Sequence, residues 1–250
     1  MISHILLTND DGYAAEGLLA LWKTVRAVWD APIRVVAPRV CHSQKSHATI
    51  THEPIRVEPM ERSPMQGFIA DGYPADCVRL GIRGLGLFKE APPLVLSGIN
   101  PGANIGMDIY YSGTVAAARE ATTLGCPAVA VSQITNKDHP MSWETTIAWA
   151  TDTLRFLKDR IEKSGPVLWN VNFPVQSGAT GIPRIELVPM STDPLAVGYD
   201  PPEDGDFHYR YSGDYFGRPG TPGSDVAALF AGAITVTPLR LDHTASELLK

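Results

Sequence analysis

The feature that most constrains the fold is an alternation of short apolar runs with helical patterns over the first two thirds of the chain. The pattern predicts strands at residues 5–8, 33–37, 94–96, 128–131 and 167–171, and helices at 14–29, 114–124 and 142–161. Regular alternation of this kind predicts an α/β fold, a mainly parallel sheet with helices on both faces. In such sheets ligands bind beyond the carboxyl ends of the strands, so we expect the functional residues there.

The character of the chain changes near Pro189. Residues 191–223 are rich in proline and glycine but also carry Tyr199, Tyr209, Tyr211, Tyr215 and Phe216. A loop of this length in a compact domain usually has a function or a partner. We therefore divide a single domain (1–250) into a catalytic core (1–190) and a C-terminal arm (191–250). A short helix at 225–230 and a strand at 234–237 follow the loop, and we expect the arm to pack elsewhere, for example on another subunit.

Composition excludes several classes of protein. The net charge of −6 argues against a nucleic-acid polymer as partner, although a small phosphorylated ligand stays compatible, since a bound metal reverses the local charge. The odd number of cysteines, with no C-x-x-C pair, argues against a disulfide framework and favours the cytoplasm. The first residues, MISHILLTNDD, lack the basic stretch of a signal peptide. No apolar run reaches the roughly 18 residues that a membrane span needs.

Adjacent carboxylates directly follow the first predicted strand. Asp10 and Asp11 lie at its end, and Gly12 permits a sharp turn. Neighbouring like charges repel each other, so this placement favours a bound cation. Taken alone, the segment is explained equally well by a solvated strand-to-helix turn with one aspartate as a helix cap.

Two further loops follow predicted strands. The loop at residues 41–47 contains Ser43 and His47, and on its own it is an ordinary polar loop. The segment LSGINPGANIG at 96–106 is more unusual, because its glycines let the backbone approach a ligand and Asn100 and Asn104 offer amide oxygens. The alternative for this segment is a tight irregular turn.

The predicted helix at 114–124 begins with small residues, in the segment SGT at 112–114. Free backbone N–H groups and the helix dipole favour an anion there, and simple N-capping explains the residues equally well.

Together, the loops would gather carboxylate, hydroxyl and amide oxygens at one edge of the sheet. Such donors suit Mg²⁺, Mn²⁺ or Ca²⁺ rather than structural zinc, and a phosphate cradle beside them suits phosphoryl transfer or hydrolysis.

Several segments together resemble the SurE (survival protein E) family of nucleotidases over nearly the whole chain. They are ILLTNDDGYAAEGL at 5–18, VVAPRVCHSQKSHATIT at 35–51, GYPADCVRLGI at 72–82, LVLSGINPGANIGMDIYYSGTVAAAREA at 94–121, WNVNFP at 169–174 and GSDVAALFAGAITVTPL at 223–239. The resemblance implies a Rossmann-like three-layer core, arms exchanged within a dimer or tetramer, and one divalent cation per subunit, Mg²⁺ or Mn²⁺. It implies hydrolysis of nucleoside 5′- and 3′-monophosphates, and members of the family are also associated with hydrolysis of short-chain polyphosphate.

The resemblance also implies roles for individual residues. The metal ligands fall on Asp10, Asp11, Ser43 and Asn100, and Asp10, Asp11 and Asn100 are the implied catalytic residues. By the resemblance, the phosphate pocket is lined by Asn104, Ser112, Gly113 and Thr114. Asn9 and Gly98 are further candidates for substrate binding, and His47, which lies near the proposed site in sequence, is a candidate contact for substrate or proton transfer. The chain departs from the usual family pattern at Gln44, where a small residue such as glycine is common, and at Arg39, where aspartate is common.

Two other functions remain to be weighed against a nucleotidase. A nucleotide- or metal-sensing module that binds without turnover is compatible with the same ligand set. A nicotinamide-dependent oxidoreductase is disfavoured, because the first strand-to-helix turn is acidic where that class needs glycines against a pyrophosphate.

Overall fold

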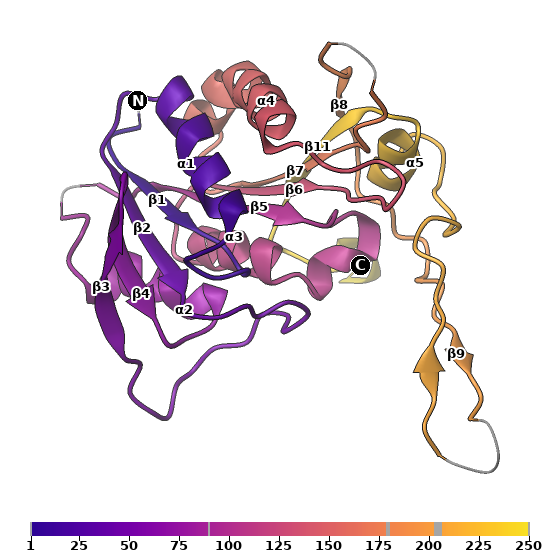
Figure 1. Ribbon diagram of the computed structural model, residues 1–250, viewed down its shortest axis with the longest axis horizontal. Helices are drawn as coiled ribbons and strands as arrows, with labels where there is room; N and C mark the ends of the chain where they lie inside the picture. Colours follow the sequence, from indigo (N-terminus) through magenta and orange to yellow (C-terminus); the bar gives the residue numbers. More distant parts are fainter. Residues whose placement is uncertain (1, 90, 179–180, 203–206, 250) are drawn as a thin grey trace.

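The computed structural model describes residues 2–89, 91–178, 181–202 and 207–249. Within these residues a nine-stranded sheet forms the centre, in the order β3-β4-β2-β1-β5-β6-β7-β11-β8 (Figure 1). Its strands are β1 (Ile5–Thr8), β2 (Ile33–Pro38), β3 (Val57–Arg62), β4 (Met65–Ala70), β5 (Leu94–Pro101), β6 (Ala128–Gln133), β7 (Leu168–Phe173), β8 (Ile185–Leu187) and β11 (Ile234–Leu239). Only the pairs β3–β4 and β7–β11 are antiparallel, so the predicted α/β fold with a mainly parallel sheet is confirmed.

Helices cover both faces of this sheet (Figure 1). On one face lie α1 (Glu16–Val28) and α4 (Trp143–Lys163), and on the other α2 (Pro74–Arg79) and α3 (Gly113–Thr123). Successive strand residues point to opposite faces, so Leu7 joins the apolar cluster under α1 and α4 while Leu6 joins the cluster under α2 and α3. Because helices cover both faces of the sheet, the core has the three layers of a Rossmann-like fold.

Part of the sheet was not predicted. The edge strand β3 and its neighbour β4, the helix α2 and the π-helical turn η1 (Leu80–Gly84) have no counterpart among the expected elements. Most side chains of β3 are partly or fully exposed, so the strand lacks the continuous apolar run of a buried parallel strand. Gly67 lets β4 pack closely on β2, because a Cβ there would lie 1.8 Å from the carbonyl oxygen of Val35.

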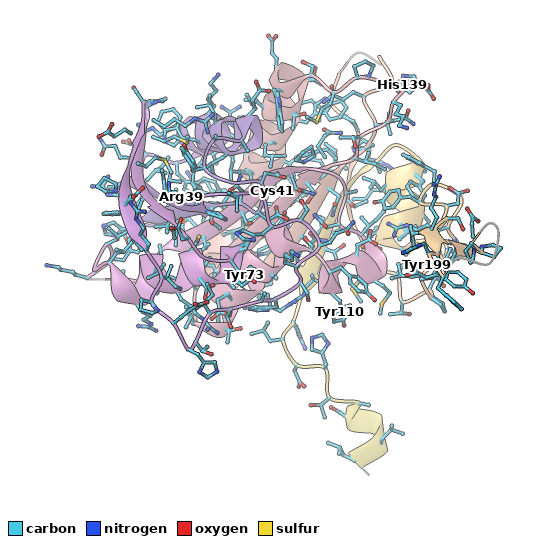
Figure 2. All side chains as sticks on the ribbon, turned by 60° about the horizontal axis from the view of Figure 1, so that its bottom comes forward. Arg39, Cys41, Tyr73, Tyr110, His139 and Tyr199 are labelled. Carbon is cyan, nitrogen blue, oxygen red and sulfur yellow. The ribbon has the colours of Figure 1, made fainter. Side chains whose placement is uncertain are left out.

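The C-terminal segment contributes both to the core and to the arm. The predicted helix and strand are present as α5 (Asp225–Phe230) and β11, but β11 lies inside the central sheet between β7 and β8. The strands β9 (Tyr199–Asp200) and β10 (Arg210–Tyr211) pair with each other and project from the body (Figure 1). Residues 240–249, ending in the 3-10 turn η3 (Ser246–Leu249), also extend away from it (Figure 2). No helix in the described ranges has the length and apolar character to cross a bilayer.

Candidate active site

One cavity of about 910 Å³ lies at the carboxyl ends of neighbouring strands. Because β1 pairs with both β2 and β5, the segments that follow these strands meet at one edge of the sheet. The predicted metal ligands Asp10, Asp11, Ser43 and Asn100 all line the cavity, together with Asn104 and Ser112. The fold therefore brings into one place side chains as far apart in sequence as Asp10 and Ser112.

The carboxylate of Asp10 packs against the N-terminus of α3. The Thr114 hydroxyl donates a hydrogen bond of 2.5 Å to Asp10 Oδ1. Gly113 makes this approach possible, since a Cβ at that position would lie 2.8 Å from the Cβ of Asp10. Ser112 caps the helix, its hydroxyl accepting from the backbone N–H of Val115 at 3.0 Å. The positive end of the helix dipole thus faces the carboxylate.

The electrostatics of the aspartate pair are unfavourable without a cation. Burial raises the pKa of Asp10, although hydrogen bonds from Thr114 oppose the shift. Burial, followed by the neighbouring charge of Asp10, raises the pKa of Asp11 to about 6. Within the described structure, Asp11 Oδ2 and Asn9 Oδ1 are buried without a hydrogen-bond partner. Orphaned oxygens beside two mutually repelling carboxylates fit a site for a hard divalent cation.

Ser43 and Asn100 complete this set of oxygen donors. The side-chain amide of Asn100 donates to the carbonyl oxygen of Gly102 at 2.6 Å, so its own oxygen is the atom available as a ligand. Ser43 Oγ lies 3.0 Å from Cys41 Sγ, and the loop is fixed to β1 where the His42 N–H donates to the Asp10 carbonyl oxygen. Across the described residues no cluster of three or more His, Cys, Asp or Glu side chains forms a metal site. The hydroxyl of Ser43 and the amide oxygen of Asn100 border the same cavity as the two carboxylates.

Three residues predicted for the substrate pocket have mainly structural contacts. Asn104 borders the cavity, but its side-chain amide donates to Ser132 Oγ at 2.7 Å. The side chain of Asn9 donates to the carbonyl oxygen of Gly12 and shapes the turn after β1. Gly98 allows close packing against β6, because a Cβ there would lie 2.3 Å from the Val131 carbonyl oxygen. Neither Asn9 nor Gly98 is among the residues that line the cavity.

His47 lies outside the cavity lining and contacts α3 instead. Its Nε2 is 2.7 Å from Glu120 Oε2, and Arg79 Nε donates to the other carboxylate oxygen at 2.6 Å. Burial raises the pKa of Glu120, but the hydrogen bonds from His47 and Arg79 outweigh it and lower the pKa overall. His42 packs its ring on Tyr73, with the ring centres 4.9 Å apart. As far as the described residues go, the cavity lining contains no histidine.

The structure adds residues that sequence reasoning missed. The cavity is also lined by Asp108, Tyr111, Leu195, Ala196, Val197, Tyr199, Tyr211, Tyr215 and Arg218, among others. Arg218 donates through both terminal nitrogens to Asp108, at 2.8 and 2.7 Å, and its guanidinium lies 4.2 Å from the ring centre of Tyr215. These partners are 110 residues apart, so no local sequence pattern links them.

The two departures from the usual family pattern have different surroundings. Gln44 lines the cavity with a positive φ of 60°, the left-handed conformation that glycine adopts without strain. The chain thus keeps the backbone shape that the usual glycine would favour. Arg39 is outside the cavity lining and forms ion pairs with Glu58 and Asp71.

The fold and the cavity define an α/β protein with a candidate oxygen-donor cation site at the edge of its parallel sheet. Comparison with known proteins agrees, since the family described as Survival protein SurE matches residues 5–194. The chain belongs to the SurE family. It is similar to the 5′-nucleotidase SurE of Paramagnetospirillum magneticum (39% identity over 98% of this chain and 93% of the relative) and to that of Campylobacter jejuni (34%, 100% and 96%). The crystal structure of the SurE protein from Aquifex aeolicus matches with a TM-score of 0.79 at 32% identity, over 98% of this chain and 96% of that one.

Proposed function

We propose that the protein is a divalent-metal-dependent nucleotidase that hydrolyses nucleoside 5′-monophosphates, and also 3′-monophosphates, to nucleoside and phosphate. The observation that carries the proposal is the convergence of Asp10, Asp11, Ser43 and Asn100 on one cavity. The relatives' names, 5′-nucleotidase SurE, support it. Short-chain polyphosphate is a further proposed substrate, since its terminal phosphate presents the same charged group.

One cation per subunit, Mg²⁺ or Mn²⁺, is held in this proposal by the carboxylates of Asp10 and Asp11, the hydroxyl of Ser43 and the amide oxygen of Asn100. When bound, the cation supplies positive charge against the phosphate and makes water more acidic. A hydrogen bond from Thr114 fixes Asp10, and Asp11 Oδ2 has no hydrogen-bond partner among the described residues.

The protein groups around the phosphate provide orientation and charge stabilisation. Asn104 and Ser112 line the cavity, and in this proposal the N-terminus of α3 around Ser112 and the amide hydrogen of Asn104 that is not bonded to Ser132 bind phosphate oxygens as charge grows on them. The oxygen of a water molecule attacks phosphorus, the ester P–O bond breaks, and its electron pair goes to the ribose oxygen. That oxygen takes a proton, for which solvent in the open cavity is a source.

Attack by a carboxylate is the alternative chemistry. Asp10 or Asp11 would then form an aspartyl-phosphate, which water hydrolyses in a second step. The stereochemistry at phosphorus separates the two routes, measured with a substrate whose phosphorothioate group is chiral through its oxygen isotopes. Direct attack by water inverts the configuration at phosphorus, whereas two successive displacements through an aspartyl-phosphate retain it, so retention would rule direct attack out.

The proposed activity is tested by measuring phosphate release from AMP with Mg²⁺ or Mn²⁺. We expect turnover that EDTA abolishes and added metal restores, with 3′-AMP and short polyphosphate tested in the same assay. A protein that binds AMP tightly in the presence of metal but releases no phosphate would instead be the nucleotide- or metal-sensing module considered above.

We also propose that the arm, residues 191–250, joins subunits into a dimer or tetramer. The paired strands β9 and β10 project from the body (Figure 1). The side chains of Tyr199, Tyr209 and Tyr211 are largely exposed. Light scattering coupled to size-exclusion chromatography measures the assembly directly. A monomer at micromolar concentration would contradict this part of the proposal.

A further inference from the structure

We infer that three buried side chains, Ser132, Asn170 and Asn172, are positioning residues that hold Asn104 and direct its side-chain amide at the phosphate. The inference rests on the proposed function and extends it to residues beneath the cavity. As far as the described residues go, none of the three belongs to the cavity lining, so each acts through Asn104.

The side chain of Asn172 pairs with both backbone groups of Asn104. The Asn104 N–H donates to Asn172 Oδ1 at 2.7 Å, and Asn172 Nδ2 donates to the Asn104 carbonyl oxygen at 3.2 Å. Asn170 Nδ2 donates to the same carbonyl oxygen at 2.8 Å. A carboxamide carries a donor and an acceptor on one planar group, so it fixes the backbone of Asn104 at two points.

The side chain of Asn104 is held by Ser132. Asn104 Nδ2 donates to Ser132 Oγ at 2.7 Å. Because the amide is planar, this bond also sets the direction of the second N–H and of Oδ1. Asn104 is only 7% exposed but lines the cavity, so its amide is held in one orientation at the place where phosphate is proposed to bind.

The three positioning residues lie in the core, where polar side chains are costly. Ser132, Asn170 and Asn172 are at most 1% exposed and belong to the adjacent strands β6 and β7 (Figure 1). Asn170 makes its bond to Asn104 although its own Oδ1 has no partner among the described residues. Thr235 is just as buried and lies directly opposite Asn172 in β11, but its hydroxyl has no hydrogen-bond partner in the described structure. Unlike Thr235, the three residues direct their hydrogen bonds to one residue at the cavity.

The loop that carries Asn104 is also anchored on either side of it. The Gly102 N–H donates to the Gln133 carbonyl oxygen at 2.8 Å, and the Gly106 N–H donates to Asp225 Oδ2 at 2.8 Å. The loop therefore rests on β6 and α5 as well as on the side chains of β7. A loop held by buried partners keeps its polar groups in place before the substrate binds, as stabilisation of developing charge requires.

The test is a double-mutant cycle on phosphate release from AMP, made of Asn104→Ala, Ser132→Ala and the double variant. We expect Asn104→Ala to lower kcat by about a hundredfold, because a donor to the developing charge is lost. Ser132→Ala should lower kcat by about tenfold with a smaller change in KM, because a misdirected amide stabilises the transition state less well. In the Asn104→Ala background the same change should cost less than about twofold, since the group that Ser132 positions is gone.

Two further variants complete the test. Asn172→Asp keeps the size of the side chain but replaces its donating nitrogen by an acceptor facing the Asn104 carbonyl oxygen. We expect it to lower kcat more than Ser132→Ala does, by about a hundredfold, and circular dichroism checks that it is folded. Thr235→Val is the matched control, because it removes a buried hydroxyl beside Asn172 that no described residue bonds, and it should leave kcat and KM unchanged.

Several results would overturn the inference. They are no loss of kcat in Ser132→Ala, a loss of the same size with and without the Asn104 side chain, or an equal loss in Thr235→Val. The same cycle is measured calorimetrically with inorganic phosphate and Mn²⁺, where we expect Ser132→Ala to weaken binding only when the Asn104 side chain is present. A wild type that binds phosphate but hydrolyses no AMP would contradict the proposed function, and the binding cycle then decides the inference alone. A wild type that binds no phosphate would overturn both.

Discussion

The metal corner and the arm border the same cavity but are built in different ways. The metal corner, which we define as Asp10, Asp11, Ser43 and Asn100, lies on loops fixed to adjacent core strands, and Asp10 is only 4% exposed. Among the described residues, the arm strands β9 and β10 pair only with each other, and Tyr199 and Tyr211 are largely exposed to solvent. The core strands thus anchor the residues assigned to chemistry, of which Asp10 is buried and Ser43 exposed, whereas the arm strands lie outside the central sheet.

Removing a carboxylate from the metal corner should produce the largest effect. We expect Asp10→Asn to lower phosphate release from AMP by about a thousandfold, because a cation ligand is lost. The metal-free protein should unfold at the same temperature or higher, since the substitution removes one of two like charges whose pKa values burial raises. Thermal melts in EDTA followed by circular dichroism measure the second effect. A collapsed fold would show that the corner is structural rather than catalytic.

Crowding the same corner should have the next largest effect. In Gly113→Ala the new Cβ would lie 2.8 Å from the Cβ and 2.9 Å from Oδ2 of Asp10, so the carboxylate must move. We expect a loss of about a hundredfold in kcat/KM with the fold intact, because misplacing a catalytic group by about 1 Å is that costly. Gly84→Ala is the control, since its Cβ meets only the flexible end of Leu80 at 3.2 Å. Equal activity in both variants would contradict a preorganised corner.

The ion pair between Arg218 and Asp108 joins the arm to the core, and removing it tests how much it stabilises the fold. Arg218→Met leaves Asp108 without its partner, and the side chains of this pair are only 7% and 20% exposed. We expect urea unfolding to show a loss of about 2–3 kcal/mol, at the lower end of the range for a buried pair because Asp108 is partly solvated. Arg155→Met breaks the exposed pair with Asp152 and should cost less than about 0.5 kcal/mol. Similar losses in the two variants would mean that the junction is not specially stabilised.

The smallest predicted effect concerns the backbone beside the metal corner. Gln44→Gly should raise the free energy of unfolding by up to about 1 kcal/mol, because glycine adopts the positive φ of 60° without strain. Ser46→Gly is the comparison, since Ser46 also has a positive φ of 54° but its hydroxyl donates to the Tyr110 carbonyl oxygen at 2.6 Å. No gain is expected for Ser46→Gly. A loss of stability in Gln44→Gly would contradict the strain argument.

The buried part of the fold was predictable because its signals are local. The apolar runs that became β1, β2, β6 and β7, and the helical spacing that became α4, follow directly from periodicity. The edge hairpin β3–β4 was missed because its exposed strand carries no such run. The position of β11 in the sheet could not be predicted either, because the neighbours of a strand are set by contacts between residues that are distant in sequence.

The residues of the candidate site divide in the same way, into those with a local sequence signal and those without one. Local motifs pointed to Asp10, Asp11, Ser43 and Asn100, and the fold gathers them at one cavity, although their roles remain proposals. Sequence proximity was a poor guide for His47, because the loop turns through two left-handed residues after Ser43 and the ring meets Glu120 instead. The pair of Asp108 and Arg218 had no local signal at all.

The most direct test of the account is to locate manganese by anomalous diffraction from crystals soaked in Mn²⁺. We expect a single strong peak per subunit, about 2.2 Å from oxygens of Asp10, Asp11, Ser43 and Asn100. Manganese bound elsewhere, or no peak in this cavity at saturating Mn²⁺, would contradict the central claim that these side chains form one cation site.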